Sequence, residues 1–213
     1  MQRILTAAAA FFETPLDLRS RVLVLIGALA LLPAFILPLW SLTLTSNQFP
    51  EGLVLDIYAQ KLEGAKTQGR DDLKEINALN HYIGMKELKE EDFTEFKWIP
   101  FVLGGIFLLL LRVVVMGKVS KLVDVVVLFM YFGGFSLWSF YRKLYLYGHD
   151  LDPTAAVTVP PFTPPLFGQQ TLANFEVYSY PEAGSYAMAL VPLLLVLAMI
   201  LAYRSSRSAQ RAR

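Results

Sequence analysis

The sequence predicts a mainly α membrane protein, with four transmembrane helices and a small α+β cap outside the cytoplasm. Of its 213 residues, 55% are hydrophobic, which is too apolar for an ordinary soluble domain. Apolar stretches close to the roughly 20 residues that cross a bilayer occur four times, and charged residues gather between them. The chain has no cysteine, so it holds no disulfide and no thiolate metal ligand.

The four apolar stretches predict transmembrane helices over residues 22–42, 98–116, 122–140 and 187–203. In the first stretch, Pro33 and Pro38 lack amide hydrogens, so we expect this helix to kink or to end early. Its apolar run is too long for a cleavable signal peptide, and no cleavage site of small residues follows it. We expect Trp40 to lie at the membrane interface as an anchor.

The distribution of charge predicts the side of the membrane that each segment faces. Segments 1–21, 117–121 and 204–213, with the adjoining helix ends, carry ten Lys and Arg but three Asp and Glu. Segments 43–97 and 141–186 carry nine Lys and Arg but fifteen Asp and Glu. Since positively charged loops stay in the cytoplasm, both termini and the turn at 117–121 are predicted to be cytoplasmic, and the two long segments form the outer cap.

The first outer segment has element patterns of its own. Residues 53–58 are rich in β-branched and aromatic side chains, which predicts a strand. Residues 71–79 predict a short helix that Asp71 or Asp72 caps and that delivers Asn80 and His81 at its end. The charged run 86–95 predicts a second short helix with a solvated face.

The second outer segment begins with an aromatic border, which is typical of the headgroup level of a membrane. The proline-rich residues 159–166 are expected to be extended, since proline and the residue before it favour polyproline or β geometry. Residues 174–180 alternate as a strand does, and they could form a small sheet with the strand at 53–58. A compact cap made from both segments would bring the two histidines of the chain within reach of each other.

The two histidines lie in compact polar motifs, and they are the candidates for chemistry. His81 and Met85 are four residues apart, so one helical turn would place the imidazole and the thioether on the same face, unless Gly84 bends the backbone. A set of His and Met without carboxylate suits Cu(I), whereas imidazole alone also suits zinc or nickel. His149 is the third candidate ligand, and its neighbours Asp150 and Asp152 could orient the imidazole.

Other interpretations of these motifs were weighed. The residues after Gly148 also fit a plain turn that follows the end of the third span. Too few oxygen ligands cluster near Asp150 and Asp152 to favour calcium. Two histidines could hold a haem, but in membrane proteins such ligands usually lie within helices, and a blue-copper site would require cysteine. No Ser, His and Asp arrangement of an enzyme is visible, so we expect no enzyme; zinc stays open.

Three strings stand out: Phe-Pro-Glu-Gly-Leu at 49–53, Asn-His-Tyr-Ile-Gly-Met-Lys at 80–86 and Tyr-Gly-His-Asp-Leu-Asp-Pro at 147–153. Together they resemble a family of largely uncharacterised bacterial membrane proteins that are encoded beside nitrous-oxide reductase and its copper-delivery accessory proteins. The resemblance covers roughly residues 38–182. It departs at 159–163, where the proline-rich segment of the family is often longer and can carry a methionine that is missing here.

The resemblance implies copper handling at the outer face of the bacterial cytoplasmic (inner) membrane. His81, Met85 and His149 are the matching ligand positions for Cu(I), and their expected polar neighbours are Asn80, Tyr147, Asp150 and Asp152. The expected partners are membrane lipid and a periplasmic cuproenzyme or copper-delivery protein, and we expect no nucleic acid. The alternative function is a non-catalytic structural or assembly subunit of a larger membrane complex, in which both motifs serve as turns and docking surface.

Overall fold

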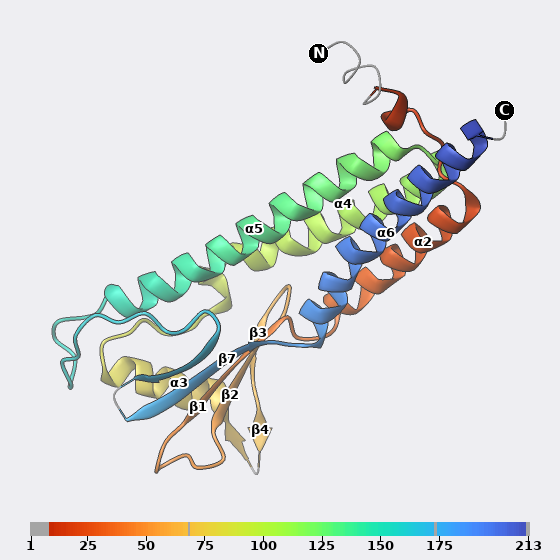
Figure 1. Cartoon of the computed structure of the whole chain (residues 1–213). Helices are drawn as coiled ribbons and strands as arrows, with labels where there is room; N and C mark the ends of the chain where they lie inside the picture. Colours follow the sequence, from red (N-terminus) through yellow and green to blue (C-terminus); the bar gives the residue numbers. More distant parts are fainter. Residues whose placement is uncertain (1–8, 68, 173, 212–213) are drawn as a thin grey trace. The chain divides into compact units, whose positions relative to one another are not determined.

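The computed structural model describes residues 9–67, 69–172 and 174–211 (Figure 1). The chain divides into two units, and each is described by itself. The helical unit comprises Met1–Pro33, Phe101–Gly133 and Tyr186–Arg213, and the cap unit comprises Ala34–Pro100 and Gly134–Ser185.

Within the described residues, four helical stretches are long and apolar enough to span a membrane. They are α2 (Leu18–Leu31) with the 3-10 turn Leu32–Phe35, α4 (Glu95–Met116), α5 (Val119–His149) and most of α6 (Ala183–Arg211). Each contains one of the four predicted apolar stretches or most of it. The prediction of four apolar helices with a small cap is therefore confirmed for the helices themselves.

The helical unit has an apolar interior and an equally apolar exterior. Val24, Leu110 and Leu195 have no exposed surface, whereas the side chains of Phe101 and Val115 are 82% and 78% exposed. Soluble proteins rarely expose large contiguous apolar patches, so this outer surface is typical of helices that face lipid.

Within the helical unit, hydrogen bonds connect the start of α2 to the last turn of α4. Asp17 caps α2 by accepting a hydrogen bond from the Ser20 amide. The first amides of a helix have no carbonyl partner within the helix, so a side-chain acceptor stabilises the helix start. The guanidinium of Arg21 donates to the carbonyls of Val114 and Val115, which lie in the last turn of α4. A cation at this position offsets the negative end of the helix dipole.

Two helices end at residues other than the predicted span bounds. The first span was predicted over 22–42 with a kink or an early end at its prolines, and its helix does end early, at Phe35, before strand β1 (Trp40–Thr45) begins. The indole of Trp40 donates to the Ser179 hydroxyl, so this residue pairs within the cap unit. The third span was predicted over 122–140, and helix α5 contains this stretch and continues through the aromatic border to His149.

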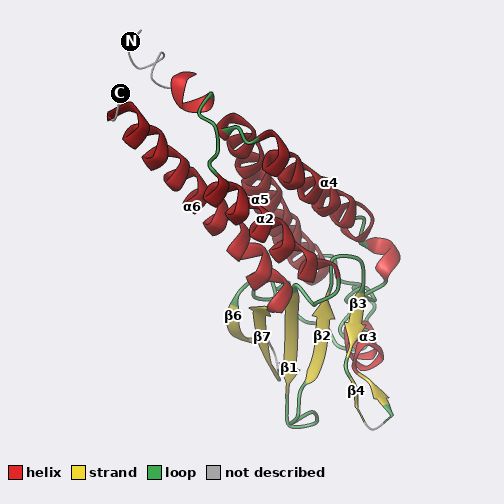
Figure 2. Ribbon diagram, turned by 90° about the vertical axis from the view of Figure 1, so that its right-hand side faces the viewer, coloured by secondary structure: helices red, strands yellow, loops and turns green. Residues whose placement is uncertain are grey.

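The cap unit is built on a five-stranded antiparallel sheet in the order β3-β2-β1-β7-β6 (Figure 2). Besides β1, its strands are β2 (Leu53–Ile57), β3 (Leu62–Gly64), β6 (Gly168–Leu172) and β7 (Phe175–Pro181). The two predicted strands, at 53–58 and 174–180, are confirmed as β2 and β7. They lie in one sheet as expected, with β1 inserted between them.

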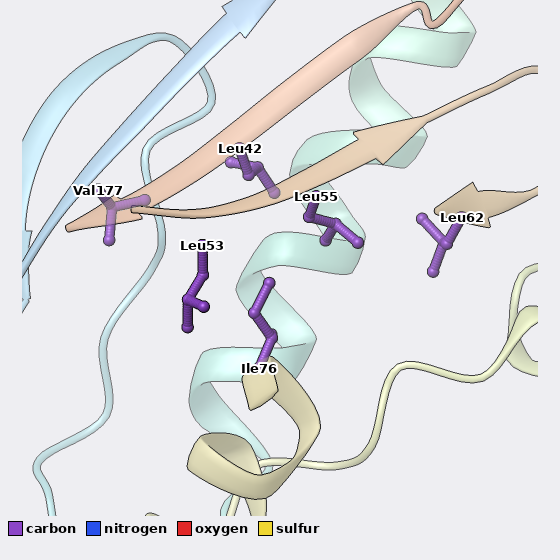
Figure 3. Packing of buried hydrophobic residues seen from close by; sticks show 6 residues of the cluster. All are labelled: Leu42, Leu53, Leu55, Leu62, Ile76 and Val177. Atoms are coloured by element: carbon purple, nitrogen blue, oxygen red, sulfur yellow. The ribbon is translucent and has the colours of Figure 1, made fainter. Parts of the chain in front are cut away.

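Helix α3 (Asp72–Tyr82) packs on one face of this sheet. The core between them contains Leu53 and Leu55 of β2, Leu42 of β1, Val177 of β7 and Ile76 of α3, and Figure 3 shows the strand side chains directed toward the helix. These residues alternate along each strand, because successive side chains point to opposite faces. The helix predicted at 71–79 is confirmed, and Asp71 caps it by accepting from the Leu73 amide.

A buried carboxylate fixes the start of α3. Asp72 is 1% exposed, and it accepts hydrogen bonds from the Val54 amide (2.9 Å) and from Arg70 Nε (2.8 Å). Arg70 in turn donates to the Gly52 carbonyl. Because a buried charge is tolerated only when it is paired and hydrogen-bonded, this cluster holds α3 to β2. Arg70 belongs to a small two-stranded ladder, β4 (Lys66–Thr67) with β5 (Arg70–Asp71).

The second short helix predicted over residues 86–95 is wrong. Only the 3-10 turn η2 (Glu90–Asp92) forms there, and α4 begins at Glu95. The reason is a contact with α3: the side chain of Asn77 accepts a hydrogen bond from the Leu88 amide and donates one to the Leu88 carbonyl. The backbone hydrogen-bonding groups of Leu88 are thereby held by α3 and are withdrawn from a local helix.

Candidate metal site

Helix α3 delivers the first motif at its C-terminal end. The helix ends at Tyr82, and Gly84 has a φ of +79°, so the backbone turns before Met85. The expected placement of His81 and Met85 on one continuing helical face is therefore wrong, and the bend at Gly84 is what forms. After this turn the Met85 amide donates a hydrogen bond to the Asn80 carbonyl (2.8 Å). In this conformation His81 is exposed and Met85 is half-buried.

Helix α5 delivers the second motif. His149 is the last residue of this helix and is exposed, and the turn that the sequence analysis considered for this motif begins directly after it. Its ring stacks on Tyr145, with the ring centroids 3.8 Å apart. His149 Nδ1 lies 2.9 Å from the Tyr145 carbonyl oxygen, which can only accept, so Nδ1 carries the proton of this bond. In the neutral ring, Nε2 then holds the lone pair that a metal needs.

The two motifs contact each other directly, through a set of contacts that we name the clasp. The Asp152 amide donates to the Gly84 carbonyl (2.8 Å), and the Val157 amide donates to the Tyr82 carbonyl (3.1 Å). The clasp also contains an ion pair, in which Lys86 Nζ lies 2.5 Å from an oxygen of Asp150. The clasp thus joins the end of α3 to the segment that follows α5, as the prediction of a cap made from both outer segments requires.

Gly84 is at the centre of the clasp. A Cβ atom at this position would lie 2.7 Å from the Asp152 carbonyl oxygen and 3.0 Å from both the Asp152 nitrogen and the Ala155 Cβ. Such a close approach of two backbones requires glycine, as does the positive φ. The sequence analysis considered Gly84 only as a possible bend, and a glycine just after a predicted helix was the available indication of its role.

The four expected polar neighbours of a metal each have another partner. Asn80 is buried, and its side chain donates to the Lys86 carbonyl, which closes the loop that carries Met85. Asp150 pairs with Lys86, and Tyr147 donates to the Glu87 carbonyl. Asp152 accepts from the amide and the hydroxyl of Thr154, in a local turn. The group that orients the His149 ring is therefore the carbonyl of Tyr145, which the sequence analysis did not consider.

Two ion pairs near the clasp, Lys86 with Asp150 and Lys89 with Glu87, lie in solvent. The ion pair with Asp150 raises the pKa of Lys86. Hydrogen bonds from Thr154 lower the pKa of Asp152, and the hydrogen bond from Lys89 lowers the pKa of Glu87. The nearby His81 contributes a smaller electrostatic lowering to the pKa of both carboxyls.

The three predicted ligands, His81, Met85 and His149, supply two imidazoles and one thioether. In the part of the chain that the structure describes, no three side chains of His, Asp or Glu gather closely enough to hold a metal ion by themselves. A site made from the two motifs would accordingly need the sulfur of Met85, and this donor chemistry fits a soft monovalent ion such as Cu(I).

Comparison of the chain with family models, with curated proteins and with solved structures gave no match.

Proposed function

We propose that the chain is a multi-pass protein of the bacterial cytoplasmic membrane whose outer cap binds Cu(I) through His81, Met85 and His149. The ion would be stored there or handed over to a periplasmic cuproenzyme or copper-delivery protein. In this proposal α2, α4, α5 and α6 cross the membrane, both termini are cytoplasmic, and the protein is not an enzyme.

The observation that carries the proposal is the clasp. Histidines more than 60 residues apart in the sequence belong to motifs that contact each other through backbone hydrogen bonds and an ion pair. Both imidazoles are exposed, and the bond from His149 Nδ1 to a carbonyl leaves the other ring nitrogen as the metal donor. Metal-ligating histidines are commonly oriented in this way.

The chemistry of the donors favours Cu(I) among the candidate metals. A thioether is a soft, uncharged ligand that zinc and calcium do not prefer, whereas cuprous copper binds thioether and imidazole together. A set of three ligands would leave a position open for transfer to a partner. The resemblance to proteins encoded beside copper-delivery genes suggests the same cargo.

The orientation in the membrane rests on charge. The two terminal segments and the turn at 117–121, with the adjoining helix ends, carry the excess Lys and Arg, and the cap segments carry the excess Asp and Glu. The positive-inside rule then supports a cap on the outer side of the membrane, where periplasmic copper proteins are found.

A competition titration against a Cu(I) chelator of known affinity tests this proposal. We expect the purified full chain to bind about one Cu(I), and the variant with His81→Ala and His149→Ala to lose it. Met85→Leu keeps the side-chain volume but removes the thioether, so it should weaken binding, whereas the matched control Met130→Leu, in α5, should not. Equal copper retention by the folded double variant would rule the proposal out.

The second candidate function is a structural or assembly subunit, and one observation favours it. The polar residues of both motifs are engaged in the clasp or in local turns, which is what residues selected for holding a cap together would do. Under this alternative, the histidine variants leave Cu(I) binding unchanged, while variants of the clasp lower the stability of the cap.

A further inference from the structure

Strand β6 is the free edge of the sheet in the cap unit. Among the described residues it pairs only with β7, and Figure 2 shows it as the outermost strand on one side of the sheet, with β3 on the other. In an antiparallel pair, every second residue of an edge strand directs its N–H and C=O away from the partner. The outer side of β6 is thus a row of backbone groups that can accept another strand.

The two edges of the sheet differ in their protection. Strand β3 is three residues long, and its Glu63 forms an ion pair with Lys61. Short length and charge are the usual means by which natural sheets prevent strands from pairing at their edges. Strand β6 is five residues long and contains neither charge nor proline, and its central residues Gln169, Gln170 and Thr171 are exposed.

An exposed aromatic pair adjoins the free edge. Phe167, the residue before β6, is 66% exposed, and its ring lies 5.3 Å from that of Tyr180, which is 43% exposed. Phe and Tyr are enriched in the cores of protein interfaces. An apolar anchor therefore lies beside an unprotected row of backbone donors and acceptors.

We propose that the β6 edge pairs antiparallel with β6 of a second copy of this chain. This interface is independent of copper binding. A two-fold axis at Gln170 would place Gln169 opposite Thr171 of the second copy, so uncharged hydrogen-bonding side chains face each other without repulsion. A second copy fits this edge because β6 is self-complementary: its Gln and Thr side chains meet the same uncharged side chains, while the carboxylate of Glu176 on β7 is held within its own chain by Gln169 and Tyr178.

The absence of cysteine from the chain makes cross-linking a clean test. Residues directly opposite in an antiparallel pair have Cα atoms about 4.5–5.5 Å apart, within the range of about 4.4–6.8 Å that a disulfide requires. Full-length chains with Gln169→Cys, Gln170→Cys or Thr171→Cys are expressed in membranes, oxidised mildly and separated without reductant. We expect a disulfide-linked dimer for Gln170→Cys and no dimer for the control Glu63→Cys on the opposite edge.

Charge substitutions distinguish a specific pair from random collision. Adding Gln169→Lys and Thr171→Lys to Gln170→Cys would place like charges opposite each other, so most of the dimer should disappear. Replacing that pair with Gln169→Glu and Thr171→Lys would place opposite charges across the two-fold axis, and the dimer should return. The inference is overturned if none of the three β6 cysteines exceeds the Glu63→Cys control, or if the two lysines leave the cross-link unchanged in a folded chain.

Discussion

Substitution of Gly84 by alanine tests the clasp through two separable effects. The φ of +79° is a left-handed conformation that costs a residue with a Cβ roughly 1–2 kcal/mol. The Cβ would also lie 2.7 Å from the Asp152 carbonyl oxygen, which is backbone and cannot rotate away. The bond from the Asp152 amide to Gly84 must then lengthen or break, and its net contribution is about 1 kcal/mol. The expected destabilisation by Gly84→Ala is therefore about 2–3 kcal/mol.

Gly69→Ala is the matched control for this prediction. Gly69 has a φ of +84°, but no atom lies within 4 Å of the position of its Cβ, so only the conformational cost applies. For a chain of this length, each 1 kcal/mol lowers the unfolding midpoint by about 2–4 °C, so Gly84→Ala should lower it by about 5–10 °C. Thermal unfolding of the purified protein, followed by near-ultraviolet circular dichroism, measures both variants. A midpoint for Gly84→Ala no lower than that of Gly69→Ala would refute the clasp.

Two further predictions concern the carboxylates of the cap unit. Asp72→Ala leaves the Arg70 guanidinium and the Val54 amide without their buried partner, and loss of one member of a buried pair costs about 3–5 kcal/mol in denaturant unfolding. The control Glu63→Ala, at a half-buried carboxylate of β3, should leave the unfolding midpoint unchanged. An equal effect of both variants would contradict the role of Asp72. Thr154→Ala removes a hydroxyl donor from Asp152, so the lowered pKa of Asp152 should rise toward its ordinary value of 3.8. A carboxyl whose pKa is lowered by folding stabilises the folded state at a pH above its ordinary pKa, and this stabilisation is lost as the pH falls through the pKa of the folded state. The variant should therefore lose stability mainly above about pH 4. An NMR titration of the carboxyl groups that shows no rise in the pKa of Asp152 would contradict this prediction.

The elements that a local pattern determines were predictable from the sequence. Helix α3 has a capping aspartate and a buried stripe, and β2 and β7 have the composition of strands, so each pattern agrees with the final structure. Strand β1 was not predicted, because its Leu42 and Leu44 continue the apolar run of the first span. Only pairing with β2 and β7 shows that this run changes from helix to strand, and such pairing is not visible in hydropathy.

The candidate site was predictable as a set of residues but not as an arrangement. Two rare histidines in outer segments indicated where to look, and the structure places both motifs in contact. Two of the contacts, from the Asp152 amide to the Gly84 carbonyl and from the Val157 amide to the Tyr82 carbonyl, are between backbone atoms, which no side-chain pattern encodes. The partner of His149 was also missed, because a carbonyl one helical turn earlier, at Tyr145, orients the ring in place of a carboxylate.

X-ray absorption at the copper edge tests the central claim most directly, because it reports the ligands themselves. The account predicts that the full chain loaded with one Cu(I) shows scattering from two imidazoles and one sulfur. It also predicts that Met85→Leu removes the sulfur and that His149→Ala removes one imidazole. Copper bound without sulfur, or a spectrum that neither variant changes, would contradict the assignment of His81, Met85 and His149 as the site.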